Sequence, residues 1–541
     1  MAATYGKTSD YDRIKRMMNV PRPLRKYLYC QIITGFLFIY LWYSFNGGLI
    51  PWFLRHRIPV LKMGPDINAL YFFPHVADDG SKLKWSHGAN TPNQLQRSLQ
   101  VDVDMIEGDV MLKGQGTETQ SLIPVMGQPR SQESGMPFED WLNNITPTGK
   151  GIKIDIQSTD AVEITLQTIK KHKDNIRVPL WIHADIFKGP LGEEPPVEGT
   201  RFIKHVERLF PQCTLSLGWT TGTHTDLSLV SYTWKMVIDM YHFVHEHELE
   251  PPLVFSVRAS LMHNSVSQIK WLTDNTRASL LVWNNPGDKV LVEDFMHLAF
   301  KFPPHNLYFD LQDKQLTEYV KENRHVSKEK INPLVLQRET VIFKPEAWVK
   351  MGLHIEQHSI LPSEEAIVLT TKTVYILTKN KYKPRNLIVL HGRVQFLNIK
   401  DKDAVGGETG LNIYMRPTGY ADFENIVGIR CFIGVDGLLQ ISGSNLKKVK
   451  NFKQTHRITP GTSNCFRFSV QDTGNEIVMR VNVLHNCETL ESTRRDEEVH
   501  AEFKVPIPAN VGIDQHPFIL KLEDSNRYAV LDELHVKYNQ L

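Results

Sequence analysis

Apolar segments alternate with amphipathic stretches between residues 82 and 312. Each apolar segment is short and rich in branched or aromatic residues, which is typical of a strand buried on both faces of a parallel sheet. We expect strands at residues 83–86, 103–110, 151–156, 180–185, 214–219, 253–257, 280–283 and 307–310. Residues 122–126 predict one further short strand, the hairpin partner of the second segment.

The stretches between these segments carry apolar residues at helical spacing. The clearest predicted helices are 160–171, 200–210, 229–247, 265–274 and 292–301. Eight strand and helix units over about 230 residues predict a (β/α)8 TIM-like barrel, which we place at residues 60–330. A doubly wound open sheet is the alternative, but no GxGxxG motif opens the first unit.

Helical periodicity disappears after residue 335, and short apolar segments separated by turn residues follow. We expect strands at 367–377, 386–396, 411–415, 426–433, 438–442, 465–470, 476–483, 502–505 and 518–522. Asp436-Gly437 and Thr473-Gly474-Asn475 are typical turn sequences between them. Many short strands with regular turns predict an all-β sandwich or jelly-roll domain over residues 336–541.

Near the N-terminus, residues 27–54 contain no charged side chain. A spanning helix needs ~20 mostly apolar residues, so we predict a transmembrane helix at residues 28–50. Basic residues are more numerous before this segment than after it, which predicts a cytosolic tail at 1–27 and an extracellular or luminal bulk, as in a single-pass type II membrane protein. A cleaved signal peptide and a buried core helix are the alternatives. The long charged region before the segment disfavours the first, and its length disfavours the second.

Composition and charge narrow the class of protein. Of the 541 residues, 41% are hydrophobic and 23% are charged, as in ordinary globular proteins. The net charge of +2 gives no reason to expect a nucleic acid partner. Of the five cysteines, Cys30 lies in the hydrophobic segment, and no CxxC pair indicates a zinc site. The other four could form up to two disulfides in an oxidising compartment, and their pairing stays open.

Polar side chains gather where the first three barrel strands end. His87 follows the first strand, Glu107 and Asp109 end the second, and Lys153 and Asp155 lie on the third. Residues two apart on a strand share a face, so each pair can point into the barrel mouth together. Three carboxylates predict a site for Mg²⁺ or Ca²⁺. Lys153 could neutralise a phosphate oxygen, and His87 could move a proton.

Six motifs occur in a fixed order: Trp85-Ser86-His87, Glu107-Gly108-Asp109, Lys153-Ile154-Asp155, Trp181-Ile182-His183-Ala184-Asp185, Leu217-Gly218-Trp219 and Ser256-Val257-Arg258. Their order resembles that of the glycerophosphodiester phosphodiesterase and sphingomyelinase D barrels. The nearer resemblance is to the menorin family, whose domain belongs to that superfamily, and it covers about residues 65–312. The resemblance implies an extracellular or membrane protein of the kind found in cell-surface complexes that pattern neuronal dendrites.

The sequence departs from the superfamily pattern at one position. The phosphodiesterase barrels use a second histidine after the hairpin strand, whereas this chain has Gln128 there. A glutamine does not titrate, so it cannot replace a catalytic histidine. His183 and His224 are the candidates to substitute for it, although we expect His183 to be structural.

Two hypotheses therefore stay open. The first is a cell-surface or luminal interaction protein that uses a degenerate phosphodiesterase barrel as its scaffold. The second is a metal-dependent phosphodiesterase that acts on glycerophosphodiesters or lysophospholipids.

Other features allow two interpretations each. Trp181, Trp219, Trp271 and Trp283 are expected in the core or along the pocket. Arg258 could bind an anion at the mouth or form a structural ion pair. The basic residues between 447 and 457 predict a solvated loop, or else a contact with acidic glycans or lipid headgroups.

Overall fold

The computed structural model describes residues 68–128, 135–222, 230–288, 290 and 292–311, and in the C-terminal half 348–351, 366–369, 374–377, 386–398, 409–419, 425–444, 452–485, 487, 501–507, 518–523 and 527–540. The predicted tail at 1–27 and the predicted span at 28–50 lie outside these residues. Among the residues that are described, no helix is long and apolar enough to cross a membrane. The domain boundary near 335 also lies outside them, so the predicted boundaries stay predictions.

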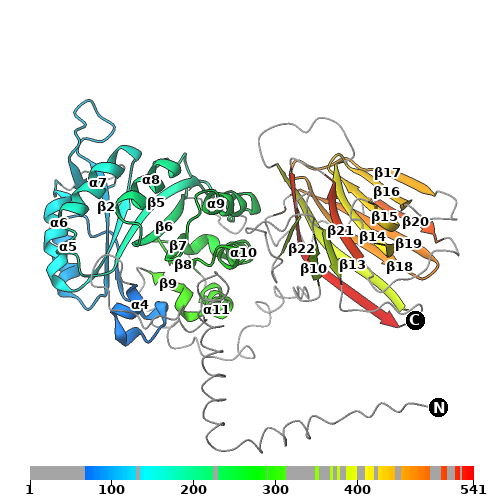
Figure 1. The fold of residues 1–541 in the computed structure, drawn as a ribbon, viewed down its shortest axis with the longest axis horizontal. Helices are drawn as coiled ribbons and strands as arrows, with labels where there is room; N and C mark the ends of the chain where they lie inside the picture. The colour runs from blue at the N-terminus through cyan, green and yellow to red at the C-terminus, as the bar shows by residue number, and fades with distance from the viewer. Residues whose placement is uncertain are drawn as a thin grey trace, which may run out of the picture. The chain divides into compact units, whose positions relative to one another are not determined.

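Eight parallel strands form the first domain, and each pairs with the next one in sequence order (Figure 1). They are β1 (Trp85–Ser86), β2 (Met105–Leu112), β4 (Gly151–Ile156), β5 (Leu180–Lys188), β6 (Thr214–Thr220), β7 (Leu253–Arg258), β8 (Ser279–Trp283) and β9 (Leu307–Asp310). This order around a nearly closed ring confirms the TIM-like barrel and excludes the doubly wound open sheet. The short strand β3 (Pro124–Met126) pairs antiparallel with β2, as the predicted hairpin requires.

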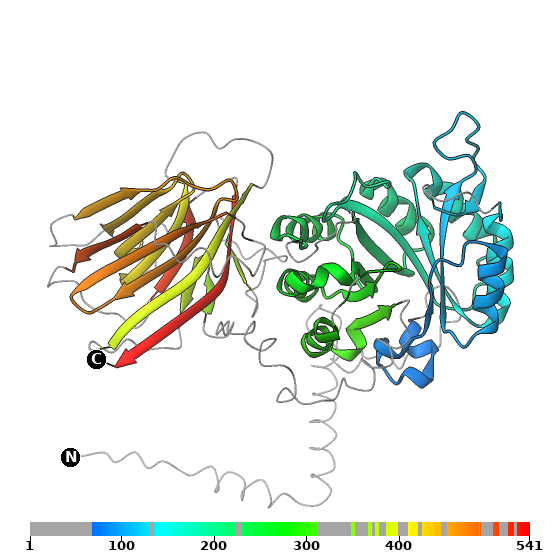
Figure 2. The same ribbon diagram turned by 180° about the vertical axis from the view of Figure 1, so that it is seen from behind.

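Helices cover the outside of this barrel, as both ribbon views show (Figures 1 and 2). They are α5 (Pro92–Gln100), α6 (Phe138–Ile145), α7 (Thr159–Lys171), α8 (Gly199–Leu209), α9 (Trp234–Glu246), α10 (Val266–Thr276) and α11 (Val292–Lys301), and the short helix α4 (Ala69–Phe72) precedes β1. In α7, the Ser158 side chain accepts a hydrogen bond from the Ala161 amide and so caps the first turn. Val162, Leu166 and Ile169 form its buried face.

The second domain consists of two antiparallel sheets. One contains β10 (Trp348–Met351), β12 (Val374–Leu377), β21 (Phe518–Glu523), β14 (Gly410–Gly419), β15 (Val427–Gly434), β16 (Leu438–Ser444) and β17 (Lys453–Arg457), in that order. The other contains β11 (Ile367–Leu369), β22 (Arg527–Gln540), β13 (Asn386–Asn398), β18 (Cys465–Asp472), β19 (Glu476–Leu484) and β20 (Ala501–Pro506). Buried residues of both sheets, such as Ile413 and Phe466, belong to one apolar cluster, so the predicted β-sandwich is confirmed.

Several strands of this domain were not expected from the sequence. The predicted strand at 367–377 is divided into β11 and β12, which belong to different sheets. The strands β10 and β22 were missed. Residues 453–457, expected as part of a loop, form the edge strand β17 because they pair with β16, although all five are exposed. Residues 447–451 of the same basic run lie outside the described part of the chain.

The four cysteines outside the N-terminal segment divide into one pair and two separate thiols. Cys465 and Cys487 form a disulfide within the second domain. Cys213 lies in the barrel and Cys431 in the sandwich, and both are buried and outside this disulfide. One disulfide is thus formed of the two that the cysteine count allowed.

Candidate functional site

The predicted site residues meet at the carboxyl ends of neighbouring barrel strands. In the register of β2 and β4, Glu107 lies opposite Lys153, and Asp109 lies opposite Asp155. Because alternate residues of a strand point to the same face, all four side chains enter the same end of the barrel. His87 follows β1 on a segment that is fixed where the Trp141 indole donates to the Ala89 carbonyl, at 2.8 Å.

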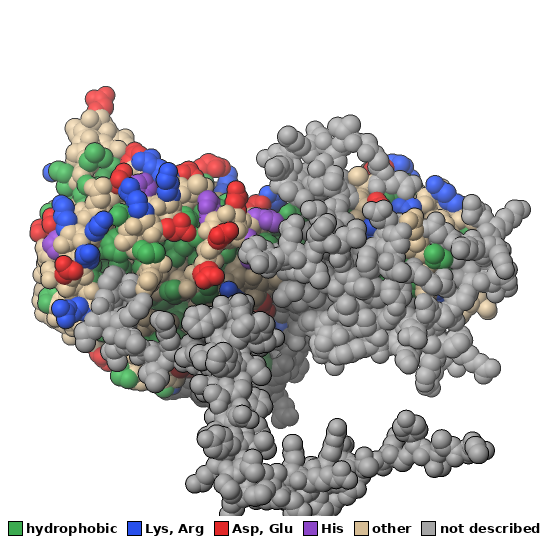
Figure 3. All heavy atoms as spheres, viewed as in Figure 1, with side chains coloured by type: hydrophobic (Ala, Val, Ile, Leu, Met, Phe, Trp, Pro, Cys, Tyr) green, Lys and Arg blue, Asp and Glu red, His purple; other side chains and the backbone are tan. Residues whose placement is uncertain are grey.

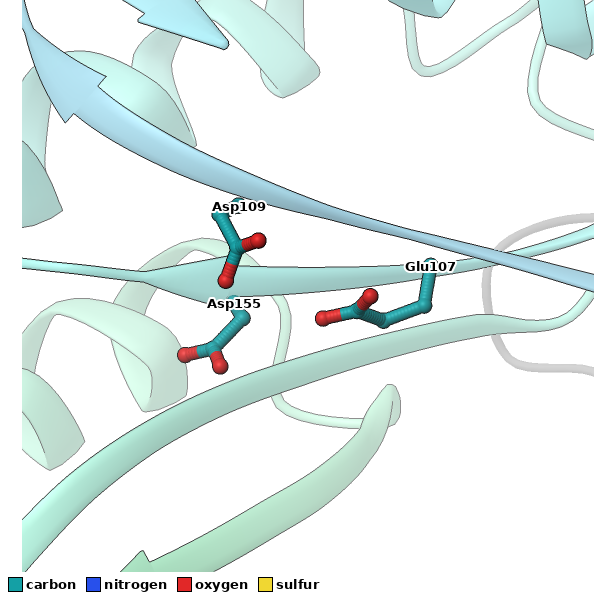
Figure 4. Close-up of side chains that lie close together, drawn as sticks. All are labelled: Glu107, Asp109 and Asp155. Atoms are coloured by element: carbon teal, nitrogen blue, oxygen red, sulfur yellow. The ribbon is translucent and has the colours of Figure 1, made fainter. Parts of the chain in front are cut away.

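Three carboxylates converge at this end (Figure 4). One oxygen atom from each of Glu107, Asp109 and Asp155 lies within 4.8 Å of the others. Burial and the neighbouring Glu107 carboxylate raise the pKa of Asp109 to about 7. Burial and the Asp109 carboxylate likewise raise the pKa of Asp155 well above its ordinary value. Each negative charge is therefore costly in this arrangement, and a cation among the three would lower that cost.

The hydrogen bonds of these carboxylates leave room for a cation. The Asp109 Oδ2 atom accepts from the Asn90 and Gln128 side-chain amides at 2.6 and 2.8 Å. Its Oδ1 atom accepts from the Gln157 amide at 2.8 Å. The Glu107 Oε2 atom accepts a hydrogen bond from the Gly88 backbone amide at 2.6 Å. Since a carboxylate oxygen has two acceptor positions, oxygen donors are still available on the triad, and their chemistry fits Mg²⁺ or Ca²⁺.

Two basic side chains lie beside the triad. The His87 Nδ1 atom is 2.8 Å from Asp310 Oδ2 and 3.6 Å from Glu107 Oε2. Burial by itself would lower the pKa of His87, but the Glu107 and Asp310 carboxylates outweigh it and raise that pKa to about 10. Burial also disfavours the charged form of Lys153, but the neighbouring carboxylates outweigh it and raise the pKa of Lys153. The largest contribution among them comes from Glu107, whose Oε1 atom is 3.8 Å from Lys153 Nζ. Both side chains are therefore positively charged at neutral pH.

These residues line a cavity of about 360 Å³. Its walls also include polar side chains that the sequence did not single out as site residues, among them Gln157, Asp185, Glu193, Glu194 and Ser256. On the barrel face shown in Figure 3, acidic and basic side chains are interspersed. Inside the cavity, by contrast, carboxylates outnumber lysine and histidine. The cavity is thus a place where cations and polar ligands are favoured over apolar ones.

The structure brings all five predicted site residues together. It also brings His183 into the cavity wall, whereas His224 lies outside the described residues. The two interpretations of Arg258 are now distinguished, because its guanidinium group pairs with Asp288 at 2.5 Å and is almost fully buried. Trp181, Trp219 and Trp271 are buried in the core, and Trp283 lines the cavity.

Asp310, which contacts His87, was also missed by the sequence analysis. Its side chain is 1% exposed, and it holds His87 although 223 positions separate the two in sequence. The available signal was its place at the end of the last predicted strand, where barrel sites gather their residues.

Comparisons with known proteins agree with this description. The model of the menorin N-terminal domain matches residues 79–316, and that of the menorin C-terminal domain matches residues 361–535. Human protein FAM151B is 34% identical over 245 residues, covering 45% of this chain and 87% of that protein. Among solved structures, a functionally unknown Saccharomyces cerevisiae protein has 10% identity and a TM-score of 0.23, covering 36% of this chain and 98% of that chain. The Caenorhabditis elegans galectin LEC-6 has 12% identity and a TM-score of 0.19, covering 36% of this chain and 99% of its own. Both scores are too low to support an argument about fold or function.

Proposed function

This chain belongs to the menorin family, and from that premise we propose that its barrel binds a phosphodiester group with the help of Mg²⁺ or Ca²⁺. The observation that carries the proposal is the convergence of three carboxylates beside Lys153 and a protonated His87 in one cavity. In this proposal the whole chain is an interaction protein that is anchored in a membrane, and its bulk lies outside the cytosol. Its partner is a protein of the cell surface.

A phosphodiester fits the charges of this cavity. A cation held by Glu107, Asp109 and Asp155 would neutralise one phosphate oxygen. The ammonium group of Lys153 and the imidazolium of His87 are available to donate hydrogen bonds to others, because each keeps further N–H groups beyond those facing the carboxylates. Charge-assisted hydrogen bonds of this kind are roughly twice as strong as neutral ones.

Gln128 favours binding over turnover. Its amide donates to Asp109 Oδ2 at 2.8 Å, at the place where phosphodiesterase barrels have a second histidine. An amide neither accepts nor releases a proton at neutral pH, so the proton transfer made by the second histidine has no group at this position. We therefore expect a bound ligand to be released without being cleaved.

Adding Mg²⁺ or Ca²⁺ to the full-length protein is expected to raise its melting temperature, because a ligand that binds only the folded state stabilises it. At a concentration of 100 times Kd, the stabilisation would be ~2.7 kcal/mol. Glu107→Gln keeps the size of the side chain but removes a charged metal ligand, so the rise should be smaller. Differential scanning calorimetry measures both proteins, with Asp174→Asn as the control, since Asp174 is an exposed acid outside the cavity. An equal rise in the wild type and in Glu107→Gln would contradict the proposal.

The partner is expected at the edge strand β17. All five residues of β17 are exposed, and an edge strand offers unpaired backbone groups to another chain. A photo-crosslinking residue in place of Thr455 should capture a protein on the surface of cells that make the full chain. The same residue in place of Asp174 is the control for position. Labelling of the same proteins from both positions would count against β17 as the binding edge.

The second candidate function is hydrolysis of a glycerophosphodiester or lysophospholipid. The contact of His87 with Asp310 favours it, because a histidine oriented by a carboxylate is a common proton donor in catalysis. This candidate requires another group to replace the histidine that Gln128 displaces.

A further inference from the structure

A second group of metal-ligating side chains lies next to the triad and shares Asp155 with it. The His183 Nε2 atom is 3.5 Å from Asp185 Oδ1 and 3.9 Å from Asp155 Oδ2. We propose that His183, Asp185 and Asp155 form a second divalent-cation site, suited to Mn²⁺ or Zn²⁺. This proposal goes beyond the proposed function, and it does not require the triad to be occupied, although Asp155 is common to both sites.

The orientation of His183 is that of a metal ligand. Its Nδ1 atom lies 2.9 Å from the Ser216 hydroxyl, which fixes the ring and leaves Nε2 facing the two carboxylates. Histidines that bind metals usually have their second ring nitrogen held by an oxygen in this way. A neutral imidazole is the form that coordinates a cation.

Gly218 makes space for this arrangement. It lies opposite Asp185 in the register of β5 and β6. A Cβ atom at this position would lie 2.2 Å from Asp185 Oδ1 and 2.8 Å from His183 Cε1. Any other residue would therefore displace the side chains of Asp185 and His183, so their arrangement requires a glycine at position 218.

An unsatisfied hydroxyl lies on the neighbouring strand. Ser256, opposite Gly218 in the register of β6 and β7, is 3% exposed and lines the same cavity. Among the residues that the structure describes, its Oγ atom has no hydrogen-bond partner. A buried hydroxyl without a partner is costly, and a hydrated cation at the proposed site would supply a water molecule to it.

Acidic side chains predominate in the wall of the cavity. Glu107, Asp109, Asp155, Asp185, Glu193 and Glu194 contribute six carboxylates, and Glu194 pairs with Lys188 at 3.0 Å. The excess of carboxylates over basic groups favours cations in this cavity. Two carboxylates and one imidazole are a donor set that suits Mn²⁺ or Zn²⁺, and a shared carboxylate typically spaces two such ions ~3.5–4 Å apart.

Equilibrium dialysis of the metal-free full-length protein against Mn²⁺ tests the proposal, with bound metal measured by mass spectrometry. We expect two ions per chain in the wild type, and an electron paramagnetic resonance spectrum in which the two ions are coupled. Asp185→Asn and His183→Gln should each bind one ion and show an uncoupled spectrum. Glu107→Gln should lose the other ion and retain the one held by His183.

The outcomes for the different variants test the two metal sites separately. One ion in the wild type, or two in Asp185→Asn, would overturn the second site while leaving the triad intact. An unchanged count in Glu107→Gln would instead overturn the triad and with it the proposed function. Ser216→Ala decides the case in which the other variants fail to fold, because it removes only the support of His183. This variant should bind the second ion with ~10–100-fold lower affinity, and an unchanged affinity would overturn the proposal.

Discussion

Gln128→His is expected to increase the rate of hydrolysis of bis(4-nitrophenyl) phosphate by ~10²–10⁴-fold, which is the usual contribution of one positioned acid or base. Gln128 lines the same cavity as His87, and its side-chain amide is 2.8 Å from Asp109. An imidazole at this position would lie beside the same carboxylate and could exchange a proton. The variant would then have imidazoles at both of these positions, where the wild type has only that of His87.

Release of 4-nitrophenolate in the presence of Mg²⁺ provides the measurement. Gln128→Asn is the matched control, because it also changes the side chain but adds no titratable group. The gain should be lost again when His87→Gln is combined with Gln128→His. If the histidine variant is no faster than the asparagine variant, Gln128 is not what separates this barrel from an active phosphodiesterase.

Asp310→Asn is expected to lower the free energy of unfolding by roughly 2–3 kcal/mol at pH 6 and by much less above pH 10. The pKa of His87 rises from 6.5 to about 10 on folding, with burial opposing and the Glu107 and Asp310 carboxylates causing the rise. At roughly 1.4 kcal/mol per pKa unit, this is ~5 kcal/mol, shared by the two carboxylates. A raised pKa stabilises the folded state fully below pH 6.5, and the contribution is lost as the pH increases to about 10.

Urea denaturation followed by tryptophan fluorescence at several pH values would measure this effect. A double-mutant cycle with His87→Gln isolates the pairwise term from general effects of each substitution. The coupling energy should be largest at pH 6 and approach zero near pH 11. A coupling energy that does not change with pH would mean that the His87 charge is not what Asp310 stabilises.

The strand ends of the barrel could be predicted because buried parallel strands leave a clear apolar pattern. Once the strands were placed, the period of two put Glu107 with Asp109, and Lys153 with Asp155, on one face. The hydrogen bond between His87 and Asp310 could not be derived in this way. It connects the first strand to the last, so it depends on closure of the ring rather than on any local pattern.

The missed strand β22 shows the opposite case. Asp532 and Glu533 interrupt its apolar pattern, and the sequence analysis predicted no strand there. In the fold, Asp532 accepts two hydrogen bonds at 2.7 Å from Arg393 on the adjacent strand β13. The buried charge is thereby paired, and a residue that argues against a strand locally becomes part of the sheet. A partner so distant in sequence has no local signal.

The position of β22 within its sheet has a consequence for synthesis of the chain. Barrel strands pair with their sequence neighbours, so that domain can assemble progressively as the chain emerges. In the second sheet, β22 lies between β11 and β13, although it is the last strand described. The edges of β11 and β13 that pair with β22 therefore stay unpaired until Arg527–Gln540 has been synthesised. A premature stop codon shortly before residue 527 would therefore remove an interior strand rather than a peripheral one, and the truncated product would be prone to aggregate.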